Sequence, residues 1–277
     1  MMDKLRDTSQ HAEVVLNNLA APLKPYLSHI GRFLLVVTFL EDALRIFMQW
    51  SEQVRFMEYY RNFPRSLAHI FLFYNVTMML TGSVMGLARF KTPVACGLLA
   101  SVVVAQTLGY GLLFHPSFML RNFSLIGGIL LLLAESFTSD GKRGRAVLFP
   151  GLPNITETEK STYVSLFGRI LLILLFGALG LQGTFSPMKK VFAVLACISC
   201  MMVAVGFKAR YSAMFLVAIL SVANIVINPW WSYGTDSAER DFLRYDFFQM
   251  LSIMGGFLLL ANSGPGELSL DEKKKSY

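Results

Sequence analysis

Residues 117–137 read SFMLRNFSLIGGILLLLAESF, one of eight apolar runs along this chain of 277 residues. The run is close to the ~20 residues with which an α-helix crosses ~30 Å of hydrocarbon. Hydrophobic residues make up 54% of the chain and charged residues only 16%, too few to coat a soluble domain of this length. The sequence therefore predicts an all-α, polytopic membrane protein. It argues against a soluble enzyme or a nucleic-acid-binding protein, and long apolar runs without alternation exclude a β-barrel.

We expect about eight transmembrane helices, and they divide the chain into five segments. The predicted spans are roughly 28–50, 66–88, 93–114, 117–137, 165–183, 189–207, 209–229 and 245–262. The predicted segments are a cytosolic N-terminal segment (1–27), a first transmembrane half (28–137), a cytosolic loop (138–164), a second transmembrane half (165–262) and a cytosolic tail (263–277).

The orientation follows from the distribution of basic residues, which give the chain a net charge of +7. Eight spans place both termini on one side of the membrane. If that side is the cytosol, the cytosolic segments hold about twice as many Lys and Arg as the opposite side, as the positive-inside rule requires. We therefore predict cytosolic termini.

Short motifs recur in the two halves. The first span opens with Gly31-Arg32-Phe-Leu-Leu and the fifth with Gly168-Arg169-Ile-Leu-Leu, while Gly127-Gly128 and Gly255-Gly256 lie in the fourth and eighth spans. A four-helix unit used twice in the same orientation would explain this pattern. Chance similarity in an apolar background is the alternative. The glycine pairs also suit close approach of helices.

Three charged residues, Glu41, Asp42 and Arg45, fall inside the first span. A charge near the bilayer centre costs about 3 kcal/mol or more and is usually paired or functional. Either carboxylate is spaced to pair with Arg45 along the helix, so we expect one to neutralise it and the other to be left over. The alternative is a buried ion network that only fixes helix packing.

Polar residues of other spans fall at the same depth, in the predicted lumenal half of the membrane. Such clustering indicates a water-accessible cavity, open to the lumen, that suits a cationic group on an apolar body. Glu135 lies near the other end of its span, where we expect a solvated helix end. The candidate site residues are Glu41, Asp42, Arg45, Gln49, Trp50, Gln106, Tyr110, Asn122, Tyr245, Asp246 and Gln249.

The C-terminus carries a second signal, Lys273-Lys274-Lys275 followed by two residues. Lysines at the third and fourth positions from the end resemble the dilysine signal by which the COPI coat retrieves membrane proteins. No phosphate loop, dinucleotide fingerprint or nucleophile elbow occurs in the sequence, so we predict no catalytic residue, metal or cofactor. Cys197 and Cys200 fall in an apolar run and are expected to pack as small residues.

Several separate blocks, in the same order over nearly the whole chain, resemble the Surfeit locus protein 4 family, which includes yeast cargo receptors of endoplasmic-reticulum (ER) vesicles. The blocks are Phe39-Leu-Glu-Asp42 with Arg45, Gln49-Trp-Ser-Glu-Gln53, Leu120-Arg-Asn122, Gly127-Gly128, Leu131-Leu-Leu-Ala-Glu-Ser136, Val205-Gly-Phe-Lys208, Tyr245-Asp-Phe-Phe-Gln249 and Asp271-Glu-Lys-Lys-Lys275.

The resemblance implies a receptor without enzymatic activity in the ER membrane, cycling through the ER–Golgi intermediate compartment and the cis-Golgi. It would bind soluble secretory proteins in the lumen, in animals including lipoproteins, partly through apolar, proline-containing tripeptides at their N-termini. COPII vesicles would carry it forward, and COPI would return it through Lys274 and Lys275. We expect Glu41, Asp42 and Asp246 to hold the ammonium group of the cargo N-terminus. Membrane lipid is the other expected partner, nucleic acid is not expected, and homo-oligomerisation is left open.

Two other classes of function stay open from the sequence. Each half has the general look of the four-span DoxX-like membrane proteins, some of which associate with redox systems, and Cys197 and Cys200 would then support thiol or quinone chemistry. A proton-coupled transporter is the third alternative, because Glu41, Asp42 and Arg45 resemble parts of a proton relay.

Overall fold

The computed structural model describes residues 24–140, 157–180, 198–203, 209–234 and 237–263, and these residues form helices and the turns between them. The predicted all-α class is therefore confirmed for the described part of the chain. The helices are α2 (Lys24–Met48), α3 (Trp50–Arg61), α4 (Arg65–Leu87), α5 (Thr92–Gly109), α6 (Pro116–Asp140), α7 (Glu157–Gly180), α9 (Ala209–Ile227) and α10 (Ala238–Ser263), with short 3₁₀ turns η1 (Leu112–Phe114) and η2 (Trp230–Ser232).

Four segments are long and apolar enough to cross a membrane: Arg65–Leu87, Thr92–Gly109, Phe118–Phe137 and Ala209–Ser232. Two further helices, α2 and α10, have 25 and 26 residues and carry the charged residues described below. A membrane protein is thus supported, while the count of eight spans and the two halves stay predictions. The predicted N-terminal segment before residue 24, most of the predicted sixth span and the terminal lysines lie outside the described residues.

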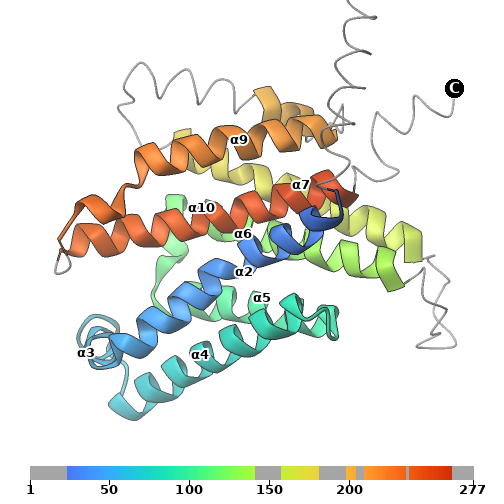
Figure 1. Ribbon diagram of the computed structural model, residues 1–277. Coiled ribbons are helices and arrows are strands. Elements are labelled where there is room, and N and C mark those ends of the chain that lie inside the picture. The colour runs from blue at the N-terminus through green and yellow to red at the C-terminus, as the bar shows by residue number, and fades with distance from the viewer. Residues whose placement is uncertain (1–23, 141–156, 181–197, 204–208, 235–236, 264–277) are drawn as a thin grey trace, which may run out of the picture.

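The long helices lie side by side, and α3 lies across one end of the bundle, beside the ends of α2 and α4 (Figure 1). Glycines bring two helix pairs into backbone contact. A Cβ added to Gly255 of α10 would lie 2.6 Å from the carbonyl oxygen of Gly31 in α2. A Cβ added to Gly127 of α6 would lie 2.7 Å from the carbonyl oxygen of Gly168 in α7. Small residues permit this close approach, as is common between membrane helices.

Three boundaries differ from the predicted ones. Residues 51–61, expected to be a loop, continue from Trp50 as helix α3, which buries Val54 and Met57 against the bundle. Helix α10 begins at Ala238 instead of 245, and Glu239 and Asp241 in its first turn suit the positive end of the helix dipole. Helix α7 begins at Glu157, inside the predicted loop 138–164. An apolar run identifies only the part of a helix that lies in hydrocarbon. Helix boundaries predicted from such runs therefore leave out the polar residues at the helix ends.

Candidate functional site

Three charged residues of α2, Glu41, Asp42 and Arg45, form ion pairs at the end of the bundle nearest α3. Arg45 pairs with Asp42, the partner one turn earlier on the same helix. Glu41 pairs instead with Arg244 of α10, whose Nε lies 2.9 Å from its Oε1. The expectation that one carboxylate would be left over was therefore wrong, because α10 supplies a second guanidinium across the helix interface.

Neighbouring helices complete the surroundings of Asp42 and Arg45. Gln106 of α5 donates a hydrogen bond from Nε2 to Asp42 Oδ2 over 2.6 Å. The Arg45 guanidinium lies 5.9 Å from the centre of the Tyr245 ring of α10, within the range of a cation–π contact. Three helices thus meet around one carboxylate–guanidinium pair.

A third ion pair joins α6 to α10. Arg121 pairs with Asp246, and their side chains are 7% and 12% exposed, so both charges are removed from solvent. Gln249, one turn after Asp246 on the same face of α10, is buried and donates to the Tyr245 hydroxyl over 3.5 Å. We call the three ion pairs with their hydrogen-bonded neighbours the polar network; it consists of Glu41, Asp42, Arg45, Gln106, Arg121, Arg244, Tyr245, Asp246 and Gln249.

Four predicted site residues lie at the margin of this network. Gln49 donates to Asp241 of α10 over 3.3 Å. The Tyr110 hydroxyl donates to Gln53 of α3 over 3.2 Å. Trp50 donates a hydrogen bond to His69 of α4 over 3.0 Å, and Asn122 donates one to Thr107 of α5 over 3.0 Å. These last two contacts join α3 to α4 and α6 to α5.

One carboxylate of the polar network retains capacity to accept hydrogen bonds. Both oxygens of Glu41 are buried and accept no hydrogen bond in the described part of the chain, although Arg244 is close enough to form an ion pair. Arg244 therefore forms an ion pair with Glu41, but its N–H group is not oriented to donate a hydrogen bond to the carboxylate. A buried carboxylate with open lone pairs can accept hydrogen bonds from a positively charged ligand.

Sequence reasoning missed the role of three residues near the start of α10. Arg244 lies just before the predicted eighth span (245–262), yet it neutralises Glu41 and also lies 5.6 Å from the centre of the Trp230 ring. Arg240 lies 5.5 Å from the same ring, and Asp241 accepts from Gln49. Three charges at helical spacing just before an apolar run were the available signal, because they continue one face of the coming helix.

A second group of charges lies at the opposite end of α2 and α6. Glu135 pairs with Arg32 over 3.0 Å and accepts a hydrogen bond from Ser28, which in turn accepts one from Arg89 over 2.8 Å. Arg32 also donates to the carbonyl oxygen of Gly86 over 3.1 Å. The expectation of a solvated helix end at Glu135 was wrong, since its side chain is 12% exposed and joins α6 to α2, where Arg32 in turn contacts α4.

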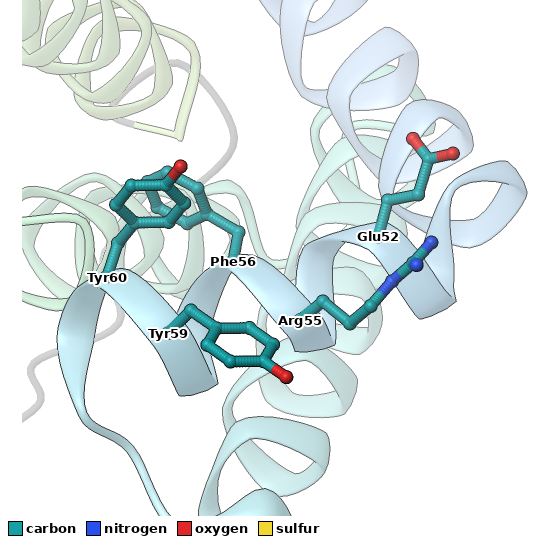
Figure 2. A pocket seen from close by; sticks show the side chains of 5 residues that line it. All are labelled: Glu52, Arg55, Phe56, Tyr59 and Tyr60. Atoms are coloured by element: carbon teal, nitrogen blue, oxygen red, sulfur yellow. The ribbon is translucent and has the colours of Figure 1, made fainter.

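A shallow pocket lies on the outer side of α3. Five side chains line it: Glu52, Arg55, Phe56, Tyr59 and Tyr60 (Figure 2). The rings of Phe56 and Tyr60 stack with centroids 5.1 Å apart, and Phe56 also lies 6.0 Å from the Tyr110 ring. We call this feature the α3 pocket; through Phe56 it contacts Tyr110, which lies at the margin of the polar network.

The described residues contain no group of three or more His, Cys, Asp or Glu side chains placed to hold a metal ion. Cys200 is buried, while Cys197 lies outside the part of the chain that the structure describes. The polar network offers carboxylates, guanidinium groups and aromatic rings, which can bind a ligand.

Apolar helices around a buried polar network at one end of the bundle define the class: a helical, polytopic membrane protein with a candidate binding site among its helices. The chain belongs to the SURF4 family, whose model matches residues 6–277.

Relatives match over most of their length. The chain is 45% identical over 259 residues to the Surfeit locus protein 4 homolog of Schizosaccharomyces pombe, covering 93% of this chain and 84% of that protein. It is 40% identical over 264 residues to the ER-derived vesicles protein ERV29 of Saccharomyces cerevisiae, covering 94% and 81%. The inner membrane protein YphA of Escherichia coli is 26% identical over 118 residues, covering 38% of this chain and 83% of YphA. No solved structure matches the chain.

Proposed function

We propose that this protein is a receptor of the ER membrane that binds soluble secretory proteins in the lumen and exports them in vesicles. Membership of the SURF4 family and similarity to a protein named for ER-derived vesicles support the compartment and the process. The observation that carries the binding role is the polar network, where Glu41 keeps unused acceptor capacity and Arg45 lies beside the Tyr245 ring.

The proposed ligand is the N-terminus of a cargo protein, an ammonium group followed by apolar side chains. Its ammonium would bind Glu41, while Asp42 and Asp246 hold Arg45 and Arg121 in place around it. Charge-assisted hydrogen bonds to a buried carboxylate are about twice as strong as neutral ones. The affinity should stay moderate, since a Kd near ~1 µM corresponds to about −8 kcal/mol and still permits release.

We further propose eight spans in two similar four-helix units with cytosolic termini. Matching glycine contacts support this repeat. Gly255 of α10 meets Gly31 and Leu35 of α2, and Gly127 of α6 meets their sequence counterparts Gly168 and Leu172 of α7. A bacterial protein similar to only 38% of this chain is consistent with a unit of about half its length.

Traffic would depend on both vesicle coats. In this proposal COPII loads the receptor with its cargo, including lipoproteins in animals, at the ER. COPI returns it from the ER–Golgi intermediate compartment and the cis-Golgi by binding Lys274 and Lys275 in a cytosolic tail. The receptor performs no chemical step in this cycle.

Photo-crosslinking from the edge of the polar network tests the proposal. A photo-reactive residue replaces Tyr110, intact microsomes are irradiated, and captured proteins are sequenced. We expect soluble secretory proteins joined through their first few residues. The matched control places the same residue at Tyr163, an exposed tyrosine of α7. Capture of lipid or quinone alone at Tyr110 would refute the receptor function.

A pair of matched variants tests the site itself. Glu41→Gln removes the proposed ammonium partner, whereas Glu135→Gln makes the same change at the other end of the bundle. We expect Glu41→Gln to reduce cargo capture per folded receptor about tenfold, as for a lost charge-assisted bond, and Glu135→Gln to leave it unchanged. Acetylation of the cargo N-terminus should reduce capture by the wild type. Equal capture by both variants would refute the site while leaving the function intact.

A further inference from the structure

The α3 pocket lies on the helix that crosses one end of the bundle. Helix α3 runs across the ends of α2 and α4 (Figure 1). The residues just before it, Phe47 and Met48, are 69% and 79% exposed, and Leu67 and Ile70 after it are exposed as well. Large apolar side chains facing outward on helices of a membrane protein contact lipid tails. The apolar side of α3, with Val54 and Met57, packs on the bundle, so its polar outer face suits the headgroup level next to such tails.

The face of α3 that points away from the bundle combines aromatic rings with two opposite charges. Tyr59 and Tyr60 are 78% and 75% exposed, and Phe56 stacks on Tyr60. Glu52 and Arg55 leave the helix beside them, one turn apart (Figure 2). Among the ion pairs of the described residues, none involves Glu52 or Arg55.

We propose that the α3 pocket binds the headgroup of a zwitterionic phospholipid. The pocket, with a volume of about 440 Å³, offers a complementary group for each part of such a headgroup. The exposed rings of Tyr59 and Tyr60 attract the ammonium group through cation–π contacts, and Phe56 supports Tyr60 by stacking on it. The Glu52 carboxylate neutralises that cation, and the Arg55 guanidinium donates hydrogen bonds to the phosphate oxygens.

The headgroup is favoured over a polypeptide by the composition and the position of the pocket. All five lining residues come from one helix, so the pocket is small and open, whereas a stable protein–protein interface needs about 800 Å² from each partner. Glu52 and Arg55 carry one charge of each sign, as a zwitterionic headgroup does. The ends of α2 and α4 next to α3 also expose large apolar side chains, which suit the acyl chains of the same lipid. A bilayer also presents headgroups at very high local concentration, so a weak site is filled.

Lipid retention by the purified full-length protein tests this inference. The protein is incubated in detergent with phosphatidylcholine or with the anionic phosphatidylglycerol, and bound lipids are counted by native mass spectrometry. The test variant is Tyr59→Ser with Tyr60→Ser. The matched control is Tyr163→Ser, another exposed tyrosine, on α7. We expect the double variant to bind phosphatidylcholine about five- to tenfold more weakly than the control, as for the loss of two cation–π contacts.

The charged residues give a second, independent readout. Glu52→Gln should remove the preference for phosphatidylcholine over phosphatidylglycerol, whereas Arg55→Gln should weaken both lipids about equally, since both carry a phosphate. Equal retention of phosphatidylcholine by the double variant and the Tyr163→Ser control would overturn the proposal. So would a photo-reactive residue at Tyr59 that captures secretory protein but no lipid in microsomes. Neither result bears on the polar network, which is tested through Glu41.

Discussion

Substitution of Gly255 by alanine should strongly destabilise the bundle. The added Cβ would lie 2.6 Å from the carbonyl oxygen of Gly31 and still closer to the amide nitrogen of Leu35. Both atoms belong to the backbone of α2, so neither can move away without moving the helix. Because real Cβ atoms essentially never lie within 3.0 Å of another atom and ordinary contacts begin at 3.4 Å, α2 and α10 would have to separate by about 0.6–1 Å along their contact.

The magnitude follows from the cost of overpacking. Extra carbon in a well-packed interior costs about 1–3 kcal/mol when side chains can adjust. Here only a helix shift relieves the clash, which also loosens the burial of Leu35 and Leu259. We therefore expect the Gly255→Ala substitution to lower the free energy of unfolding by about 3 kcal/mol, near the upper end of that range. For a chain of this size, such a loss lowers the melting temperature by about 8 °C.

The change in melting temperature is measured by heating the protein in detergent and monitoring the remaining folded fraction by size-exclusion chromatography with fluorescence detection. The matched control is Gly97→Ala in α5, where an added Cβ meets no atom within 4 Å and alanine improves helix propensity. Gly127→Ala, at the corresponding contact with Gly168, should destabilise by a similar amount. A Gly255→Ala protein as stable as the Gly97→Ala control would refute the proposed backbone contact between α2 and α10.

Three further outcomes follow from buried and terminal charges. Asp42→Asn should destabilise the protein by about 3 kcal/mol, because it leaves the Arg45 charge uncompensated at a mostly buried site; a thermal midpoint equal to that of the wild type would contradict this. Arg169→Leu should leave stability unchanged or raise it by about 1 kcal/mol, since the fully buried guanidinium makes no hydrogen bond in the described part of the chain; a lowered melting temperature would refute this reasoning. Lys274→Ala with Lys275→Ala should move the protein from the ER to the Golgi or beyond, measured by immunofluorescence, and unchanged localisation would count against the retrieval signal.

The level of the polar network along the bundle could be predicted, but not its pairing. Counting positions along each apolar run placed Asp42, Gln106 and Asp246 at one depth, because a helix rises by a constant ~1.5 Å per residue. The structure brings Gln106 into contact with Asp42. It gives Asp246 a different partner, Arg121, since depth does not say which way a side chain points.

The expectations from the sequence that proved wrong concern polar residues near the ends of helices. Glu135 was expected in solvent and is instead held by Ser28 and Arg32 of another helix. Arg244 was expected just before the eighth span and lies in the second turn of α10. Hydropathy identifies the apolar middle of a membrane helix. It does not show where the same helix continues, with charged residues, beyond the hydrocarbon.

The sequence by itself determined the class of this protein: apolar runs too long and too poor in charge for a soluble domain require helices in a membrane. It also determined the family, through blocks spread over the chain. Only the tertiary structure decided that Glu41 meets Arg244 and that Glu135 meets Arg32. The physical reason is that a periodic pattern fixes which residues share a face along one helix, whereas partners on different helices depend on how the helices cross and rotate. In this bundle that geometry depends on glycine contacts such as Gly31 with Gly255.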